Sequence, residues 1–223
     1  MNSDHSFNEN EKNAVYRVMK ERRDVRRFKS DPIPSAVLGK ILEAAMQAPS
    51  VGYMQPWNFI LIEDREVRRK VHEAFLRANE EAKAQFPGER GEKYASLKLE
   101  GILESGLNIC VTCDRKRFGP VILGRTCQPD MDLYSTVCAV QNLWLAARCE
   151  GIGVGWVSIL KPEELPPILG LPEGVVPIAY LCVGYTENFA PEPELKTAGW
   201  LPEIPHGDLI YWNRWGRPMG DRP

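Results

Sequence analysis

Apolar residues recur at helical spacing between residues 10 and 23 and again between residues 37 and 46. This periodicity predicts two amphipathic helices near the start of the chain. Pro32 and Pro34 favour the start of the second helix, because proline is tolerated in the first helical turn. Pro49 marks the point near which that helix ends. The segment between the two helices is therefore expected to be a loop.

Later in the chain, short continuous apolar runs typical of buried strands alternate with longer helical stretches. Asp64 is a suitable N-cap for a long charged helix, and Gly151 is a suitable left-handed residue after the last one. The pattern predicts strands at about 57–62, 108–113, 154–159 and 176–183, helices at 64–85, 97–103 and 131–149, and a turn at 87–91.

The helix expected at 131–149 is apolar on nearly all sides. A helix of this kind is buried centrally or shared with a partner subunit. By contrast, residues 191–223 are rich in proline and tryptophan and show little periodicity, which indicates an extended arm. Residues 1–9 are expected to be disordered. Together the elements predict an α+β fold with helices around one mixed sheet and an extended C-terminal arm.

Composition narrows the class of protein. The chain has 223 residues, 43% of them hydrophobic, which suits a single domain over residues 1–223. Its 28 basic and 30 acidic residues nearly balance, so nothing indicates nucleic acid or an anionic membrane as a partner. The polar N-terminus and the absence of a long apolar run favour a cytoplasmic protein.

Metal and disulfide chemistry receive little support from the sequence. Cys110 and Cys113 are the one closely spaced cysteine pair, and they fall in a predicted buried strand. A single pair of this kind is a weak zinc or redox signal, and buried free thiols explain it better. His5, His72 and His206 are scattered along the chain, so no metal site is expected.

A dense cluster of arginines, Arg22, Arg23, Arg26 and Arg27, surrounds Asp24 just after the first helix. Guanidinium groups bind phosphate well, because each offers a planar fork of donors. Their charge should keep Asp24 ionised, so that it could accept a proton or a hydroxyl hydrogen bond beside a bound phosphate ester. The alternative is that Asp24 only forms ion pairs at a helix end.

A second segment favours the functional role of Asp24 over ion pairing alone. The run from Ala48 to Trp57 reads APSVGYMQPW, and the cluster at 22–28 reads RRDVRRF. In order and spacing these two blocks resemble the flavin-dependent nitroreductase superfamily. Within it, the chain is most similar to the branch that makes 5,6-dimethylbenzimidazole from flavin, which has Asp where ordinary nitroreductases have Ser or Thr. The blocks DPIP at 31–34, LKLE at 97–100 and GVGWVSIL at 153–160 agree with this resemblance.

The resemblance implies a homodimer with reduced FMN bound as a substrate at the subunit interface. It also implies that the C-terminal arm reaches across the partner, that dioxygen is a co-substrate and that no metal takes part. Asp24 and Ser158 would be catalytic, as a base and as a residue that positions protons at the reactive ring nitrogen. Gly153 and Gly155 would let the backbone approach the flavin ring, and Trp57 could line the site or pack in the core. The implied flavin contacts are Arg22, Arg23, Asp24, Val25, Arg26, Ser50, Gln55, Leu99 and Ser158.

One departure and two alternatives remain. Relatives place a basic residue after a Gly-Trp pair in the arm, whereas this chain has Leu201 there, so Arg214 or Arg217 would have to substitute. An ordinary nitroreductase or dehalogenase that uses NAD(P)H is the main alternative, and a non-catalytic flavin carrier is another. Because no nicotinamide-binding glycine motif is present, a separate flavin reductase is expected to supply reduced FMN.

Overall fold

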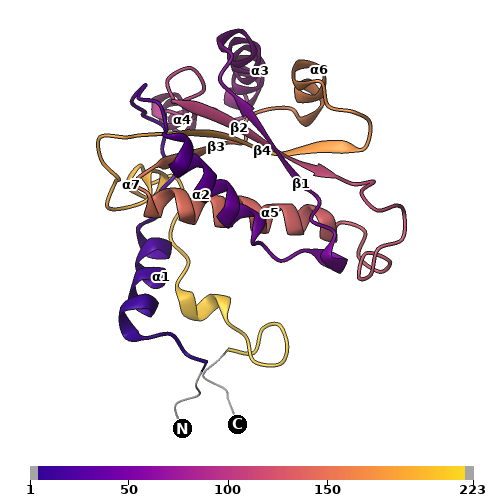
Figure 1. Ribbon diagram of the computed structural model, residues 1–223. Helices are drawn as coiled ribbons and strands as arrows, with labels where there is room; N and C mark the ends of the chain where they lie inside the picture. Colours follow the sequence, from indigo (N-terminus) through magenta and orange to yellow (C-terminus); the bar gives the residue numbers. More distant parts are fainter. Residues whose placement is uncertain (1–4, 219–223) are drawn as a thin grey trace. The chain divides into compact units, whose positions relative to one another are not determined.

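The computed structural model describes residues 5–218 (Figure 1). The chain forms two compact units, Met1–Pro191 and Glu192–Pro223. The division predicted from sequence, one domain with an arm from about residue 190, stays a prediction. Of the residues expected to be disordered, 1–4 lie outside the described part. Asn8, in contrast, caps α1 (Glu9–Glu21) through a capping box with Glu11.

A four-stranded sheet forms the centre of the first unit. All strand pairs are antiparallel, and within the described residues the sole parallel pairing is an isolated bridge between Asp24 and Val154. The expected mixed character of the sheet is thus confined to this bridge. The strands, in spatial order, are β1 (Trp57–Ile62), β2 (Leu107–Asp114), β4 (Val175–Gly184) and β3 (Gly153–Val157).

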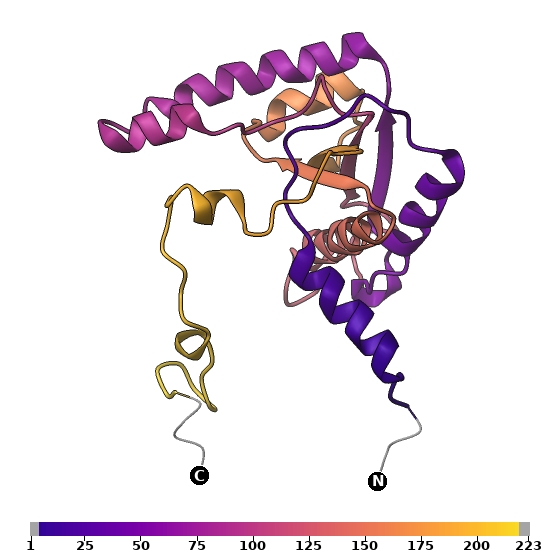
Figure 2. The same ribbon diagram turned by 90° about the vertical axis from the view of Figure 1, so that its left-hand side faces the viewer.

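Helices cover both faces of the sheet (Figures 1 and 2). On one face lie α2 (Ser35–Met46) and α5 (Met131–Cys149). Side chains of the two helices and of all four strands form the larger hydrophobic cluster, which includes Trp57. Burial at this scale is the main source of stability, at about 25 cal/mol per Å² of apolar surface. Of the two readings of Trp57, the structure supports core packing, because its side chain is buried in this cluster.

The opposite face of the sheet is covered by α3 (Arg65–Lys83) and the short α6 (Leu165–Leu169). Asp64 caps α3 by accepting the N–H groups of Glu66 and Val67, as the sequence predicts. The second hydrophobic cluster lies here and includes the buried thiols of Cys110 and Cys182. Burial raises the pKa of both thiols to about 12, so these cysteines are inert at neutral pH.

The region after α3 differs from the prediction. Residues 89–96 form the helix α4 (Glu89–Ser96), where a turn was expected at 87–91, and residues 97–103 are not helical. Glu89 and Glu92 favour the first turn of α4 because they face the positive end of the helix dipole. Gly101 instead packs on Arg26 and Phe28, where a Cβ would lie 2.6 Å from the Phe28 ring. Tertiary contact therefore overrides the helical pattern of 97–103.

Three single-turn 3-10 helices complete the described elements: η1 (Val51–Tyr53), η2 (Pro162–Glu164) and η3 (His206–Leu209). The second unit contains η3 and the short α7 (Glu194–Thr197). Within it Lys196 pairs with Glu192 and with Glu203. No helix in the described part of the chain is long and apolar enough to cross a membrane.

Candidate active site

The arginine-rich segment 22–28 leaves the end of α1 and runs along the outer edge of β3. Val25 donates its N–H to the carbonyl of Val154 over 2.9 Å. Gly155 permits this approach, because a Cβ there would lie 2.0 Å from the carbonyl oxygen of Val25. Gly153 likewise leaves room for the buried Val25 side chain. The two glycines thus admit the chain's own segment, and their approach to a flavin ring stays a prediction.

Asp24 is held between β3 and Arg26. Its Oδ1 accepts the N–H of Trp156 at 3.0 Å and a guanidinium N–H of Arg26 at 2.8 Å, and its Oδ2 accepts a second one. Arg26 also donates to the carbonyl of Trp156 at 2.9 Å. Asp24 and Arg26 are therefore held together by a bidentate ion pair. The pair is held against β3 by the N–H and the carbonyl of Trp156.

Burial raises the pKa of Asp24, and this outweighs the lowering by Arg26, the Trp156 N–H and Arg22. The sequence argument considered only the positive charges, which favour the ionised form. Packing of the segment against β3 removes water from the carboxylate, and desolvation penalises its charge. The side chain remains 41% exposed, so water limits the shift. A carboxylate with a raised pKa is a stronger base than a free one.

Arg22 and Arg23 lie beside this pair. The Arg22 guanidinium carbon is 4.7 Å from the centre of the Trp144 ring, within cation–π range. Arg23 donates to three main-chain carbonyls, those of Lys20, Arg22 and Pro191. Within the described residues its buried Nε has no hydrogen-bond partner. A buried donor without a partner is costly, so it marks a place where an anion would be stabilised.

Ser158 lies two residues beyond Trp156, about 6.5 Å further along an extended chain. It is exposed and lines a small, mainly apolar pocket of about 220 Å³ with Leu160 and Tyr180. Asp24 is bonded to the main chain of Trp156, so Ser158 follows this contact by two residues along the chain.

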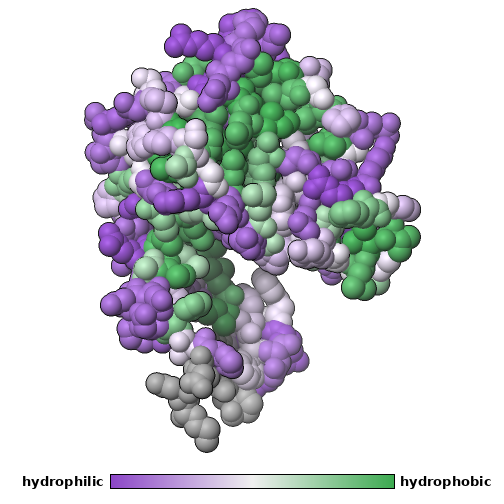
Figure 3. Space-filling model, viewed as in Figure 1, coloured by the Kyte–Doolittle hydropathy of each residue, from purple (hydrophilic) through white to green (hydrophobic). Residues whose placement is uncertain are grey.

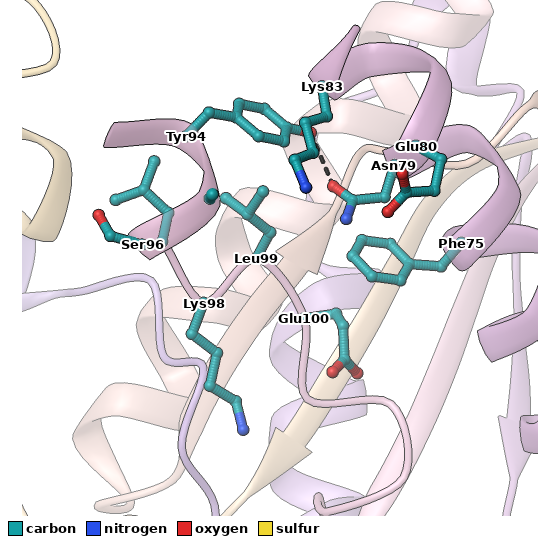
Figure 4. Close-up of a pocket in the computed structure, with 11 residues that line it drawn as sticks. Phe75, Asn79, Glu80, Lys83, Tyr94, Ser96, Lys98, Leu99 and Glu100 are labelled. Atoms are coloured by element: carbon teal, nitrogen blue, oxygen red, sulfur yellow. Dashed lines mark hydrogen bonds between the residues drawn. The ribbon is translucent and has the colours of Figure 1, made fainter. Parts of the chain in front are cut away.

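Leu99 lies on the segment that follows α4 and lines a larger pocket of about 400 Å³ between α3 and α4. Figure 4 shows Asn79 of α3 facing Tyr94 of α4, whose hydroxyl donates to Asn79 Oδ1 at 2.7 Å, and Phe75 of α3 pointing toward Leu99. Glu100 accepts the N–H of Ile102 at 2.6 Å, so its carboxylate is partly occupied within the chain. Two residues from Leu99, Gly101 contacts the Arg26 carbonyl, which makes this pocket a neighbour of the arginine cluster.

Ser50 and Gln55 occupy a different place. Their loop is anchored to the start of α5, where the N–H of Val51 donates to Ser135 Oγ at 3.0 Å. The N–H of Gln55 donates to Ser50 Oγ at 3.0 Å, which leaves the Ser50 hydroxyl proton free to donate to a ligand. The loop leads directly into β1, which is the edge strand opposite β3.

Within one chain, therefore, the two halves of the predicted site are apart. Trp144, beside the arginine cluster, is nine residues along α5 from Ser135, beside the Ser50 loop, a rise of about 14 Å. Likewise β1 and β3 are separated by two strands, or about 14 Å across the sheet. Ser50 and Gln55 do not join the residues at the edge of β3.

Trp144 is a residue of the candidate site that the sequence pattern did not single out. Its Nε1 donates to the carbonyl of Arg23 at 3.2 Å, and its ring contacts Arg22. The one signal in the sequence was its place on the helix expected at 131–149, which is apolar on nearly all sides. No cluster of three or more His, Cys, Asp or Glu suited to a metal ion occurs between residues 5 and 218.

Comparisons with known proteins found relatives in sequence and in fold. The nitroreductase family model matches residues 19–185. A 5,6-dimethylbenzimidazole synthase of Rhodospirillum rubrum is 43% identical over 83% of this chain and 88% of that protein. Another, of Rhodobacter capsulatus, is 36% identical over 90% of this chain and 97% of that protein. Among solved structures, iodotyrosine deiodinase bound to FMN and 3-iodo-L-tyrosine has a TM-score of 0.69 at 22% identity, covering 90% of this chain and 98% of that one. The last likeness concerns the fold alone.

Proposed function

Because the chain belongs to the nitroreductase family, we propose that it makes 5,6-dimethylbenzimidazole, the lower ligand of cobalamin. The reaction is the oxygen-dependent fragmentation of reduced FMN with release of a sugar phosphate. The two relatives at 43% and 36% identity, both named for this product, support the proposal. The observation that carries it is Asp24, a carboxylate fixed by Arg26 and the main chain of β3, where ordinary nitroreductases have a hydroxyl.

The residues at the edge of β3 suit FMN. The guanidiniums of Arg22 and Arg26 and the unpaired Nε of Arg23 are donors for a phosphate and for the electron-rich pyrimidine edge. Hydroxyl and amide groups of Ser50 and Gln55 suit ribityl and ring contacts. When bound, reduced FMN supplies both the electrons for dioxygen and the carbon skeleton of the product.

Asp24 acts as the base in this proposal. Arg26 and the Trp156 N–H fix the orientation of its carboxylate, so it can accept a proton from a ribityl carbon or hydroxyl without reorienting. Its raised pKa strengthens this role. Ser158, two residues after Trp156 in the chain, positions a proton at the reactive ring nitrogen.

A second copy of the chain completes the site. Proteins of this family are commonly dimers with flavin at the interface. The separation of Ser50 and Gln55 from the arginine cluster supports the same assembly here, with Ser50 and Gln55 supplied by the partner. Exposed apolar side chains on two neighbouring helices also support it, because large apolar surfaces favour association. They are Val15, Tyr16 and Met19 on α1 and Tyr134 and Val137 on α5. Figure 3 shows apolar patches among polar side chains in the region of α1.

The source of reduced FMN is a separate flavin reductase in this proposal, since the sequence has no nicotinamide-binding glycine motif. The second unit is proposed to lie against the partner subunit. Within that unit Leu201, Leu209 and Trp215 are exposed, so they present apolar surface that a partner would cover.

The decisive experiment mixes the protein with photoreduced FMN, admits air and searches for 5,6-dimethylbenzimidazole by mass spectrometry. The wild-type protein should form it, and Asp24→Asn should bind FMN without forming it. Asp64→Asn is the matched control, because asparagine caps a helix as well as aspartate does. Flavin recovered intact from the wild type would contradict the proposal and favour an NAD(P)H-dependent nitroreductase or dehalogenase.

A further inference from the structure

The loop that presents Gln55 is held in a strained conformation. Tyr53 has φ 56° and Gln55 has φ 46°, both in the left-handed region. Gly52, the central residue of η1, has φ 52°. Residues other than glycine rarely adopt this conformation, and they keep it only where surrounding contacts hold them there. Two such residues on one loop therefore require a partner that fixes the backbone.

Arg117, on the segment that follows β2, is that partner. Its Nη1 donates to the carbonyl of Gln55 and, at 3.2 Å, to the carbonyl of Trp57. Its Nη2 donates to Oδ1 of Asn58. Asp114 lies on the other side of the guanidinium, 3.6 Å from Nε. One planar group thus reaches three acceptors on the Gln55 loop and the start of β1.

Other contacts hold the 3-10 turn and the two ends of the loop. Within the turn, the N–H of Met54 donates to the carbonyl of Val51, and the side-chain amide of Gln55 donates to the carbonyl of Tyr53. The start of β1 is already held, because Asp114 N–H donates to the carbonyl of Pro56 at 2.7 Å and Trp57 pairs with Cys113. The other end of the loop is held by Ser135. What Arg117 adds is control of the Gln55 carbonyl, and the neighbouring Gln55 N–H in turn fixes Ser50 Oγ.

We propose that Arg117 is a positioning residue for the flavin site, which acts by fixing Gln55 and, through it, the Ser50 hydroxyl. This inference rests on the proposed function, because Gln55 and Ser50 are flavin contacts there. Lysine cannot replace Arg117, since a single ammonium lacks the fork that reaches the Gln55 carbonyl and Asn58 together.

A mutant cycle tests the proposal, with photoreduced FMN titrated under argon in a calorimeter. Arg117→Lys should weaken FMN binding about tenfold, the effect of losing one hydrogen bond to a charged group. In a background that carries both Ser50→Ala and Gln55→Ala the same change should weaken binding less than about twofold, because both flavin-contacting side chains that Arg117 positions are gone. Arg117→Gln, measured alongside, should show the same dependence on the background.

Arg77→Lys is the control, because it makes the same substitution at an exposed arginine that faces Glu164 on another element. It should leave FMN binding unchanged. An equal loss of affinity from Arg117→Lys in both backgrounds would overturn the positioning role, since a general loss of stability does not depend on Ser50 or Gln55. Unchanged binding in Arg117→Lys would also overturn it. A wild-type protein that does not bind FMN would overturn the proposed function and this inference together.

Discussion

The folded protein disfavours the ionised form of Asp24, although Arg26 forms an ion pair with its carboxylate. Its pKa is raised on folding, so the folded state binds a proton more tightly than the unfolded state does. Ionisation therefore costs stability as pH rises from the unfolded pKa, about 3.9, and the cost is complete once the pH has passed the higher folded value. A group whose ionisation costs stability is in keeping with the catalytic role proposed for Asp24.

A stability measurement checks this sign. Without ligand at pH 7, Asp24→Asn should melt at the same temperature as the wild type or higher. The difference should shrink as the pH falls toward 3.9 and disappear about one unit below it, where the wild-type carboxyl is protonated in both states. Thermal melts from about pH 3 to 7 followed by circular dichroism would record it. A variant that melts lower at pH 7 would mean that the Arg26 ion pair outweighs burial.

The sequence predicted Asp24 as a candidate residue but not the direction of its pKa shift. Arg22 and Arg26 are close in sequence, so their effect could be anticipated from the pattern alone. The burial that outweighs them comes from Trp156 and the rest of β3, more than a hundred residues away along the chain. Such contacts appear only when the chain is folded.

Among the elements, β3 depends on Gly155 for its contact with the arginine-rich segment. Gly155→Ala should lower the free energy of unfolding by about 1–3 kcal/mol, the usual cost of overpacking, because the new Cβ meets the Val25 carbonyl. It should also weaken FMN binding, since Asp24 and Arg26 are displaced with Val25. Urea unfolding and FMN titration measure the two effects.

Gly39→Ala is the control for this substitution. Gly39 lies inside α2 with nothing within 4 Å of its would-be Cβ, so alanine should stabilise the helix by up to about 1 kcal/mol. If Gly155→Ala lowered neither the free energy of unfolding nor the affinity for FMN, the close contact of β3 with residues 24–26 would not be needed to position Asp24 and Arg26.

Element prediction succeeded where local patterns and tertiary contacts agree. β1 and α5 were placed at their observed bounds, because apolar runs and end signals coincide there. It failed at α4 and at residues 97–103. Their helical spacing was real, but Gly101 fits against Phe28 only when the segment is not helical. The packing partner lies on a distant part of the chain and leaves no local signal.

For the whole molecule, the separation of the two half-sites predicts complementation between inactive chains. Asp24→Asn and Gln55→Ala dimers should each lose product formation. When the two variants are unfolded together and refolded, mixed dimers should regain one intact site, with Asp24 from one chain and Gln55 from the other. About half of the refolded chains should then be in mixed dimers, since symmetric subunits pair at random.

Activity after mixing is the measurement, with 5,6-dimethylbenzimidazole as the readout. Refolding each variant alone is the control and should give no recovery. Absence of recovery in the mixture, with dimers present by light scattering, would mean that both residues serve a site within one chain. The sequence could not predict this sharing from its own pattern, because spacing along a chain does not reveal which copy a residue faces.

The attachment of residues 24–26 to β3 also affects how readily the protein pairs with other chains. β3 is an edge strand, and edge strands offer free N–H and carbonyl groups with which other extended chains can pair. Asp24 occupies the N–H of Trp156, Val25 occupies the carbonyl of Val154 and Arg26 occupies the carbonyl of Trp156. The segment proposed to bind the substrate thus also protects the sheet against edge-to-edge aggregation.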